Sequence, residues 1–214
     1  LKKHKNLKIA SVFSHLACAD SPELDFFTQE QINCFEQISQ EITSAFDYKI
    51  LRHSCNSAAS VRFPQVHYDM IRLGIGMYGI GVNQETQKHL RYVHKLQSRL
   101  SEIRTIEKGE GVSYMRRFVA EKQSKIGVIP IGYADGLNRH LSEKGFRVWI
   151  NGKLAPIIGS ICMDMCMIDL SDIEAKVGDK VVIFGEENPV ENMAKALDTI
   201  SYEVFTSVSQ RIKR

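Results

Sequence analysis

The feature that most constrains the fold is a change in hydrophobic pattern near residue 81. Before this point, two short apolar segments flank a long amphipathic one. After it, short apolar segments of strand length follow one another with turns between them. A helical crossover favours parallel pairing of the strands that it joins, whereas tight turns favour antiparallel pairing. The sequence therefore predicts an α/β part followed by a predominantly antiparallel β part.

In the first part, Lys8–His15 and Tyr48–His53 read as strands. A turn at Ser21-Pro22 follows the first strand. Thr28, with Gln31 three residues later, has the pattern of a capping box and predicts a helix start. The expected helix then repeats apolar residues at spacings of three and four, which is typical of an amphipathic helix: Ile32, Phe35, Ile38, Ile42 and Phe46.

In the second part, a polar stretch over residues 81–89 is the expected linker. Asn151-Gly152 lies between two apolar segments and predicts a type I′ hairpin turn, and Val177-Gly178-Asp179 predicts another tight turn. One helix is expected over Val190–Leu197. The expected strands are Val93–Ile106, Lys125–Ile131, Arg147–Ile150, Leu154–Ile158, Cys166–Leu170 and Lys180–Phe184.

Composition narrows the class of protein. The 214 residues carry a net charge of only +3 with dispersed cations, which argues against nucleic acid as a partner. No apolar run approaches the roughly 18 residues that span a bilayer, and the basic N-terminus does not read as a signal peptide. The five cysteines lack paired spacings, so we expect reduced, mostly buried thiols in a cytoplasmic protein and no metal site.

Two small-residue motifs in the first part have the composition of anion sites. The first, HSCNSAASVRFP (53–64), follows a predicted strand and offers Asn56 and Ser57 as hydrogen-bonding side chains, although a helix N-terminus packed on the sheet explains NSAA equally well. The second motif is DMIRLGIGMYGI (69–80). A short strand is expected to end at Arg72 in this motif, and Gly74 and Gly76 then expose backbone amides that can bind an anion. A bend without a ligand is the alternative for these glycines.

Further motifs place a tyrosine or a carboxylate beside glycines or at strand ends. GVSYMRRF (111–118) puts Tyr114 after a turn and before Arg116 and Arg117, whose side chains are also consistent with plain solvent exposure. Two further motifs are IPIGYADGLNR (129–139) and GSICMDMCMIDL (159–170). Taken individually, Asp135 and Asp164 in these motifs are more typical of turn-forming or structural carboxylates than of functional groups. Tyr202 is equally consistent with a functional residue and with a core tyrosine whose hydroxyl lies at the rim of the core.

Taken in order, these motifs resemble the alanine racemases, which use pyridoxal 5′-phosphate (PLP). The resemblance runs through essentially the whole chain, and each motif alone would be weak. The segments that carry it are VFSHLACAD, HSCNSAA, MIRLGIGMYG, GVSY, IGYADG, ICMDMCMID, TISYEV and SQRIKR.

The resemblance implies the C-terminal part of a TIM-like barrel that binds PLP, over residues 1–88, followed by a mainly antiparallel β domain over residues 89–214. It implies interconversion of L- and D-alanine for peptidoglycan precursors. It also implies a homodimer in which the β domain of one subunit completes the site of the other.

Site residues follow from the matched positions. Ser57, the backbone of Gly74 and Ile75, and Tyr202 match the phosphate-binding positions of the family, and Asn56 adjoins them. Arg72 matches the arginine that faces the pyridine nitrogen. Because an arginine stays protonated, it leaves that nitrogen without a proton and makes the cofactor a weaker electron sink.

Tyr114 matches the catalytic tyrosine, which serves one face of the substrate while the PLP lysine serves the other. A free tyrosine has a pKa near 10, so this role requires nearby positive charge. The resemblance places Tyr133 and Arg139 along the access channel and Met163 and Asp164 at the substrate. It implies that four residues act in trans: Tyr114, Tyr133, Met163 and Asp164.

The sequence departs from the family pattern in three ways. Nothing resembles the motif of the PLP lysine, VKANAYGHG, so we expect that lysine outside this chain and no activity from the chain alone. Met115 stands where many relatives have glycine, and Ser160 where many have arginine. Two alternatives stay open: an interaction or dimerisation module without activity of its own, and a racemase for serine or a broader range of amino acids.

Overall fold

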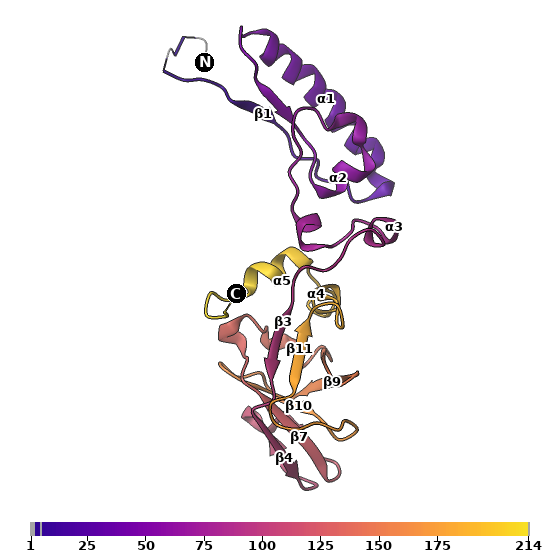
Figure 1. Cartoon of the computed structure of the whole chain (residues 1–214), viewed down its shortest axis with the longest axis vertical. Coiled ribbons are helices and arrows are strands. Elements are labelled where there is room, and N and C mark those ends of the chain that lie inside the picture. Colours follow the sequence, from indigo (N-terminus) through magenta and orange to yellow (C-terminus); the bar gives the residue numbers. More distant parts are fainter. Residues whose placement is uncertain (1–2, 5, 214) are drawn as a thin grey trace. The chain divides into compact units, whose positions relative to one another are not determined.

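The computed structural model describes residues 3–4 and 6–213 and divides the chain into two compact units, Leu1–Val93 and His94–Arg214 (Figure 1). The first unit carries the long helix α1 (Asp25–Ser44), and the second carries the β-sheet.

The first unit contains a strand–helix–strand crossover. Strands β1 (Ser11–Phe13) and β2 (Leu51–His53) pair in parallel, with Ser11 opposite Leu51 and Phe13 opposite His53. The chain passes from β1 to β2 through a 3₁₀ turn, η1 (Pro22–Leu24), and α1. The parallel pairing predicted from the long crossover is confirmed.

The core of this unit lies between α1 and the short helix α2 (Ser57–Arg62). Ile32 and Phe35 are the buried apolar residues of α1, as the periodicity predicts. Ile38 of the same stripe is exposed, and Phe46 lies beyond the helix, which ends at Ser44. The core cluster comprises Leu16, Ala19, Ile32, Cys55, Ala58, Ala59, Phe63 and Val66.

Two local predictions in this unit are wrong. Thr28 is not an N-cap: α1 begins at Asp25 because the turn at Pro22 leads directly into it, and the Thr28 hydroxyl donates to the Leu24 carbonyl at 3.2 Å. The segment before Arg72 is irregular, not a strand. One backbone bond joins it to β2, from Asp69 N to Arg52 O (3.0 Å), and another joins it to the loop after β2, from Arg72 N to Cys55 O (2.9 Å).

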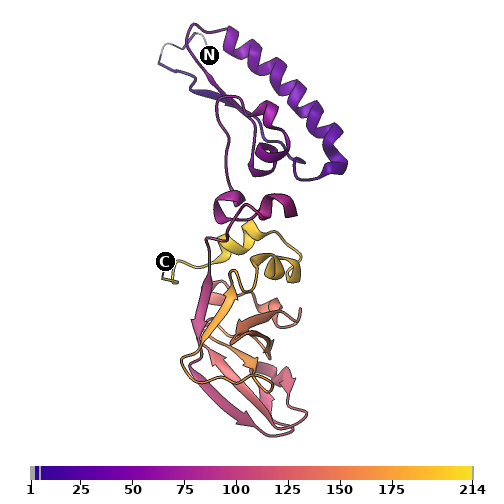
Figure 2. The same ribbon diagram turned by 45° about the vertical axis from the view of Figure 1, so that its right-hand side comes forward.

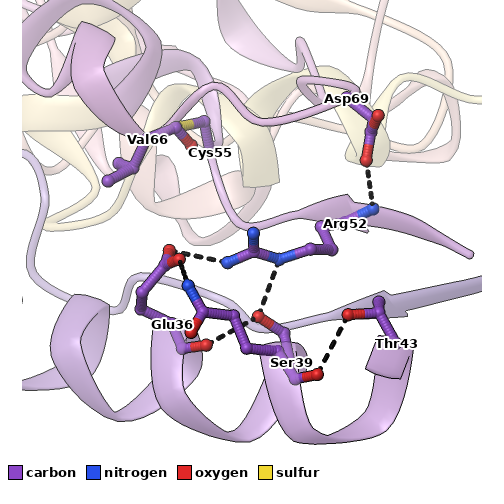
Figure 3. Close-up of polar contacts among 8 residues, drawn as sticks. Glu36, Ser39, Thr43, Arg52, Cys55, Val66 and Asp69 are labelled. Atoms are coloured by element: carbon purple, nitrogen blue, oxygen red, sulfur yellow. Dashed lines mark hydrogen bonds and ion pairs between the residues drawn. The ribbon is translucent and has the colours of Figure 1, made fainter. Parts of the chain in front are cut away.

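Arg52 of β2 fastens this irregular segment and α1 to the strand (Figure 3). Its backbone N–H donates to the Asp69 carboxylate at 2.8 Å, which lowers the pKa of that carboxyl. Its guanidinium forms an ion pair with Glu36 at 2.6 Å and donates to the Ser39 hydroxyl at 2.8 Å. Arg52 therefore binds the segment that leads to Arg72 through its backbone and α1 through its side chain.

The rest of the first unit is built from short turns. They are η2 (Pro64–Val66), η3 (Ile75–Tyr78) and α3 (Gln84–Gln87). Asn83 caps α3 by accepting from Thr86 N at 2.8 Å. The polar stretch expected as a linker thus contains one short helix.

The second unit is a seven-stranded sheet in which every neighbouring pair is antiparallel (Figure 2). Strand order is β3-β11-β8-β9-β10-β7-β4. The strands are β3 (Leu96–Arg99), β4 (Glu102–Ile106), β7 (Ser124–Ile129), β8 (Arg147–Ile150), β9 (Lys153–Ile158), β10 (Cys166–Asp169) and β11 (Lys180–Phe184). A separate hairpin, β5 (Gly111–Val112) with β6 (Phe118–Val119), is not apparent in the hydrophobic pattern.

The single strand predicted over Val93–Ile106 is two strands at opposite ends of the sheet order. The chain changes partner at Leu100, whose N–H donates to Asp179 O, and at Ser101, whose N–H donates to Val128 O. The predicted hairpin turn between β8 and β9 is confirmed by positive φ at both Asn151 (47°) and Gly152 (84°).

Two helices close the second unit. Helix α4 (Val190–Ala196) lies where the sequence predicts it, and α5 (Ser201–Ser207) is a helix that the hydrophobic pattern did not indicate. Within the described residues, no helix is long and apolar enough to cross a bilayer.

All five cysteines are free. Burial is less general than expected, since only Cys55 and Cys166 are buried while Cys34 is exposed. Burial raises the pKa of both buried thiols, and protonated thiols are poor nucleophiles.

Candidate functional site

The loop after β2 and the start of η3 build a cradle of hydrogen-bond donors in the first unit. The Ser57 side chain is buried, and its oxygen accepts the backbone N–H groups of Gly74 (2.9 Å) and Gly76 (3.3 Å). Asn56 shapes the loop: its Oδ1 caps α2 by accepting from Ala59 N, and its Nδ2 donates to Leu16 O. Backbone donors that converge on one oxygen form the arrangement that binds phosphate oxygens in anion nests.

Arg72 lies in the same unit and is held by the ends of both strands. One terminal nitrogen donates to Ser14 O at 2.8 Å and to Ser54 O at 3.2 Å. The other lies 2.7 Å from Nδ1 of His53, and the guanidinium carbon is 5.4 Å from the centre of the Phe13 ring. Since a guanidinium only donates, Nδ1 of His53 is the acceptor and the imidazole carries its proton on Nε2.

His53 is therefore held as a neutral base. Its ring is buried and stacks on Phe13 with centroids 5.4 Å apart and planes 8° apart. Burial, and secondly the charge of Arg72, lower the pKa of His53. Arg72 thus contacts a neutral partner and keeps its full positive charge.

We predict that the free energy of unfolding falls as the pH drops below about 6.5, the ordinary pKa of histidine. Below that pH the unfolded chain binds a proton that folded His53 does not, so stability is lost at up to about 1.4 kcal/mol per pH unit. Urea unfolding at about pH 7.5 and about pH 5.5, for the native chain and His53→Gln, measures this slope. An NMR titration of His53 with a midpoint at or above about 6.5 would contradict the prediction.

In the second unit, Tyr114 stands at the tip of the hairpin formed by β5 and β6. It begins the 3₁₀ turn η4 (Tyr114–Arg116), and its side chain is 69% exposed. It borders an open hollow of about 420 Å³, whose walls also include Ser113, Cys162, Met163, Asp164 and Met165. Met115 has a φ of 61°, the left-handed conformation that favours glycine.

Two loops place Tyr133 beside Met163. Tyr133 N donates to Cys162 O and Ala134 N to Met163 O, both at 3.0 Å. Gly132 permits this approach, since a Cβ there would lie 2.3 Å from the carbonyl oxygens of Cys162 and Met163. The loops that the sequence predicts to carry substrate-binding residues are therefore adjacent.

Asp164 carries an ion pair that the sequence did not indicate. Its carboxylate lies 2.6 Å from Arg211, whose guanidinium also approaches the buried carboxylate of Asp135 at 3.7 Å. Asp135 in turn accepts the N–H of Gly132 at 3.0 Å. The C-terminal segment thus connects both loops.

The remaining expected residues are distributed as follows. Arg139 lies 6.0 Å from the ring of Tyr133, and Tyr202 is half-exposed on α5. Arg117 forms an ion pair with Glu143, and Arg116 donates to Gly109 O at 2.8 Å. Both arginines beside Tyr114 thus have partners other than the phenol.

The sequence did not indicate the contacts of His53 and Arg211. Each lies inside a motif that was recognised, HSCNSAA and SQRIKR, but their contacts join segments 19 and 47 residues apart. The opposite charges of Asp164 and the basic C-terminus are the only sequence signal for this ion pair. They do not distinguish Arg211 from the other basic residues there.

An α/β unit with a donor cradle, followed by an antiparallel β unit with a tyrosine in a strained turn, defines a two-unit protein of the α/β-plus-β class. The sequence matches the family description "Alanine racemase, N-terminal domain" over residues 1–82 and "Alanine racemase, C-terminal domain" over residues 93–214. The chain belongs to the alanine racemase family. The expected fold class, part of the barrel followed by the antiparallel β domain, is confirmed.

Individual relatives agree. The alanine racemase of Clostridium tetani is 40% identical over all of this chain and 57% of its own length. Among solved structures, the alanine racemase of Clostridium difficile 630 is 35% identical with a TM-score of 0.89, over 99% of this chain and 56% of that one. That of Streptomyces coelicolor A3(2) is 31% identical with a TM-score of 0.89, over 100% and 57%. The chain thus spans a little over half the length of the relatives that it matches.

Proposed function

We propose that this chain forms part of a PLP-dependent alanine racemase that interconverts L- and D-alanine for peptidoglycan precursors in the cytoplasm. Residues 1–88 belong to the cofactor-binding barrel and residues 89–214 to the β domain. The lysine that holds the cofactor lies outside these 214 residues, because no segment resembles its motif and relatives are covered to only 57% of their length. By itself the chain is expected to be inactive.

The observation that carries this proposal is the convergence of backbone donors on Ser57. The N–H groups of Gly74 and Gly76 both donate to the Ser57 hydroxyl oxygen, so a phosphate oxygen that replaces this hydroxyl as acceptor, or that accepts the hydroxyl proton, meets donors in place. The donor set suits the 5′-phosphate of PLP. The amide of Ile75 belongs to the same cradle in this proposal, and Asn56 keeps the loop in shape. Tyr202 is assigned to the phosphate by the family resemblance alone.

When bound, PLP supplies the electron sink that acidifies the Cα proton of an amino acid. Arg72 would hold the ring nitrogen with a hydrogen-bond donor. Its guanidinium donates to a neutral His53. Because an arginine does not give up its proton, it would leave the ring nitrogen unprotonated and the cofactor a weaker electron sink.

Tyr114 is the acid/base group on one face of the substrate, and the lysine serves the other. Inversion at Cα needs a group on each side, because the proton leaves one face and returns to the opposite one. The exposed phenol, at the edge of a hollow lined by Met163 and Asp164, is open to a substrate that approaches from outside this unit. We therefore expect a homodimer with composite sites, in which Tyr133 and Arg139 line the access channel.

A second candidate function, an interaction module, is favoured by exposed apolar side chains in the first unit. Phe13 is 64% exposed although it lies in β1, and Leu51 of β2 and Ile38 of α1 are also exposed. A strand pair with bare apolar residues tends to associate. This candidate predicts self-association or partner binding that is independent of PLP and alanine.

The test is reconstitution. The chain is incubated with PLP and reduced with borohydride, and racemisation is assayed for the chain alone and after mixing with the unmatched N-terminal part of the Clostridium tetani relative. We expect no lysine adduct and no activity from the chain alone, and both from the mixture. An adduct on one lysine of the isolated chain would overturn the assignment of the lysine. PLP binding by the mixture that Ser57→Ala does not weaken would overturn the phosphate cradle.

A further inference from the structure

The turn that carries Tyr114 is strained in this chain. Ser113, Met115 and Arg116 all have positive φ, at 66°, 61° and 49°. None is a glycine, and L-residues with side chains rarely adopt this conformation. Such a turn persists only when its surroundings impose it.

Two serine hydroxyls supply that restraint. Ser113 Oγ donates to the carbonyl of Ser160 at 2.7 Å, and Ser160 Oγ donates back to the carbonyl of Tyr114 at 3.3 Å. Ser160 is only 4% exposed, so water does not readily replace the Tyr114 carbonyl as the acceptor of its hydroxyl. The bonds join the hairpin tip to a loop 46 residues away in the sequence.

The phenol has no comparable restraint. The described contacts give the Tyr114 side chain no hydrogen bond or ring partner, and Arg116 and Arg117 are engaged by Gly109 and Glu143. The backbone of the turn therefore sets where the Cβ of Tyr114 lies, and thus the point from which the phenol projects. Because that backbone is strained, the contacts that hold the turn also position the base of the side chain.

The geometry points to Ser113 and Ser160 as positioning residues for Tyr114, acting as a reciprocal latch that keeps the turn in its left-handed conformation. This inference rests on the proposed function for its catalytic consequence, since it is the acid/base role of Tyr114 that the latch serves. The latch itself is a property of this chain alone.

The first experiment uses the 214-residue chain and hydrogen–deuterium exchange of the amides at residues 114–117, among them Arg116 N, which donates to Ser113 O. Ser160→Ala and Ser113→Ala should each accelerate exchange there by about tenfold or more, leaving the β7 and β10 amides unchanged. Ser101→Ala is the matched control, because that hydroxyl also donates to a carbonyl, at 3.1 Å, but lies outside the turn. Unchanged exchange at 114–117 in both latch variants would overturn the inference.

A double-variant cycle separates a latch from general loosening. Glycine tolerates the φ of Met115, so Met115→Gly removes part of the strain that the latch opposes. The effect of Ser160→Ala on exchange should be smaller in the Met115→Gly background than in the native one. Effects that simply add would show that the serines do not act on this strain.

In the reconstituted racemase, Ser160→Ala should lower kcat by about tenfold with little change in KM, because alanine binding does not depend on the aim of the phenol. If the native mixture has no racemase activity, the proposed function fails while the exchange experiment still decides the latch. If racemisation is normal and Ser160→Ala changes KM alone, the positioning role is wrong although the function stands.

Discussion

Replacing Tyr114 by phenylalanine should reduce racemisation by at least about 100-fold, the usual contribution of a positioned acid/base group. The change removes one oxygen from a side chain that is 69% exposed and has no described hydrogen bond, so folding should be unaffected. The measurement is kcat for both directions of alanine interconversion in the reconstituted enzyme. PLP binding should remain, since the phosphate cradle lies in the other unit.

Tyr48→Phe is the matched control for this variant. Its hydroxyl accepts the backbone N–H of Ile9 at 3.1 Å and lies outside the proposed site. The control should lose a little stability and no activity. Equal losses of activity in the two variants would mean that Tyr114 is not the acid/base group.

Replacing Arg72 by alanine should have the largest effect on the stability of the first unit. Three acceptors lose their donor at once: the carbonyls of Ser14 and Ser54 and Nδ1 of His53. At about 1 kcal/mol for each, the free energy of unfolding should fall by about 3 kcal/mol. Urea unfolding followed by circular dichroism measures the loss, and fluorescence of Trp149, the only tryptophan, reports on the second unit.

Lys49→Ala is the control for charge removal in the same unit. Lys49 forms an ion pair with Asp69 at 2.9 Å but is mostly exposed, so its loss should cost less than about 1 kcal/mol. Arg72→Lys should be intermediate, because one ammonium does not reach all three acceptors. If Arg72→Ala lowered the free energy of unfolding no more than Lys49→Ala does, the three contacts of Arg72 would not stabilise this unit.

Much of the fold is predictable because it follows from local periodicity. The spacing of Ile32 and Phe35 indicates the buried side of α1, and Asn151-Gly152 indicates the turn between β8 and β9. Predictions fail where a neighbouring turn or a tertiary contact overrides the local pattern. Thr28 has the sequence of a cap, yet Pro22 starts the turn that places it inside the helix.

The strand predicted over Val93–Ile106 shows the same limit. Its residues all have strand character, but Leu100 and Ser101 bond to different neighbours, and the chain crosses to the other end of the sheet order there. Period-two alternation reports which residues favour a strand and carries no information about which strand each one joins.

At the site, the resemblance of the ordered motifs to the alanine racemases nominated Ser57, Arg72, Tyr114, Met163 and Asp164 as functional candidates. Sequence alone also indicated the change from an α/β unit to an antiparallel β unit, since hydrophobic periods and turn residues are local properties. Only the tertiary structure decided which groups restrain these candidates. His53 against Arg72, Arg211 against Asp164, and Ser160 against Tyr114 are contacts between segments far apart in the chain. Such contacts depend on how the backbone is folded, and the side chains that make them leave no periodic pattern in the sequence.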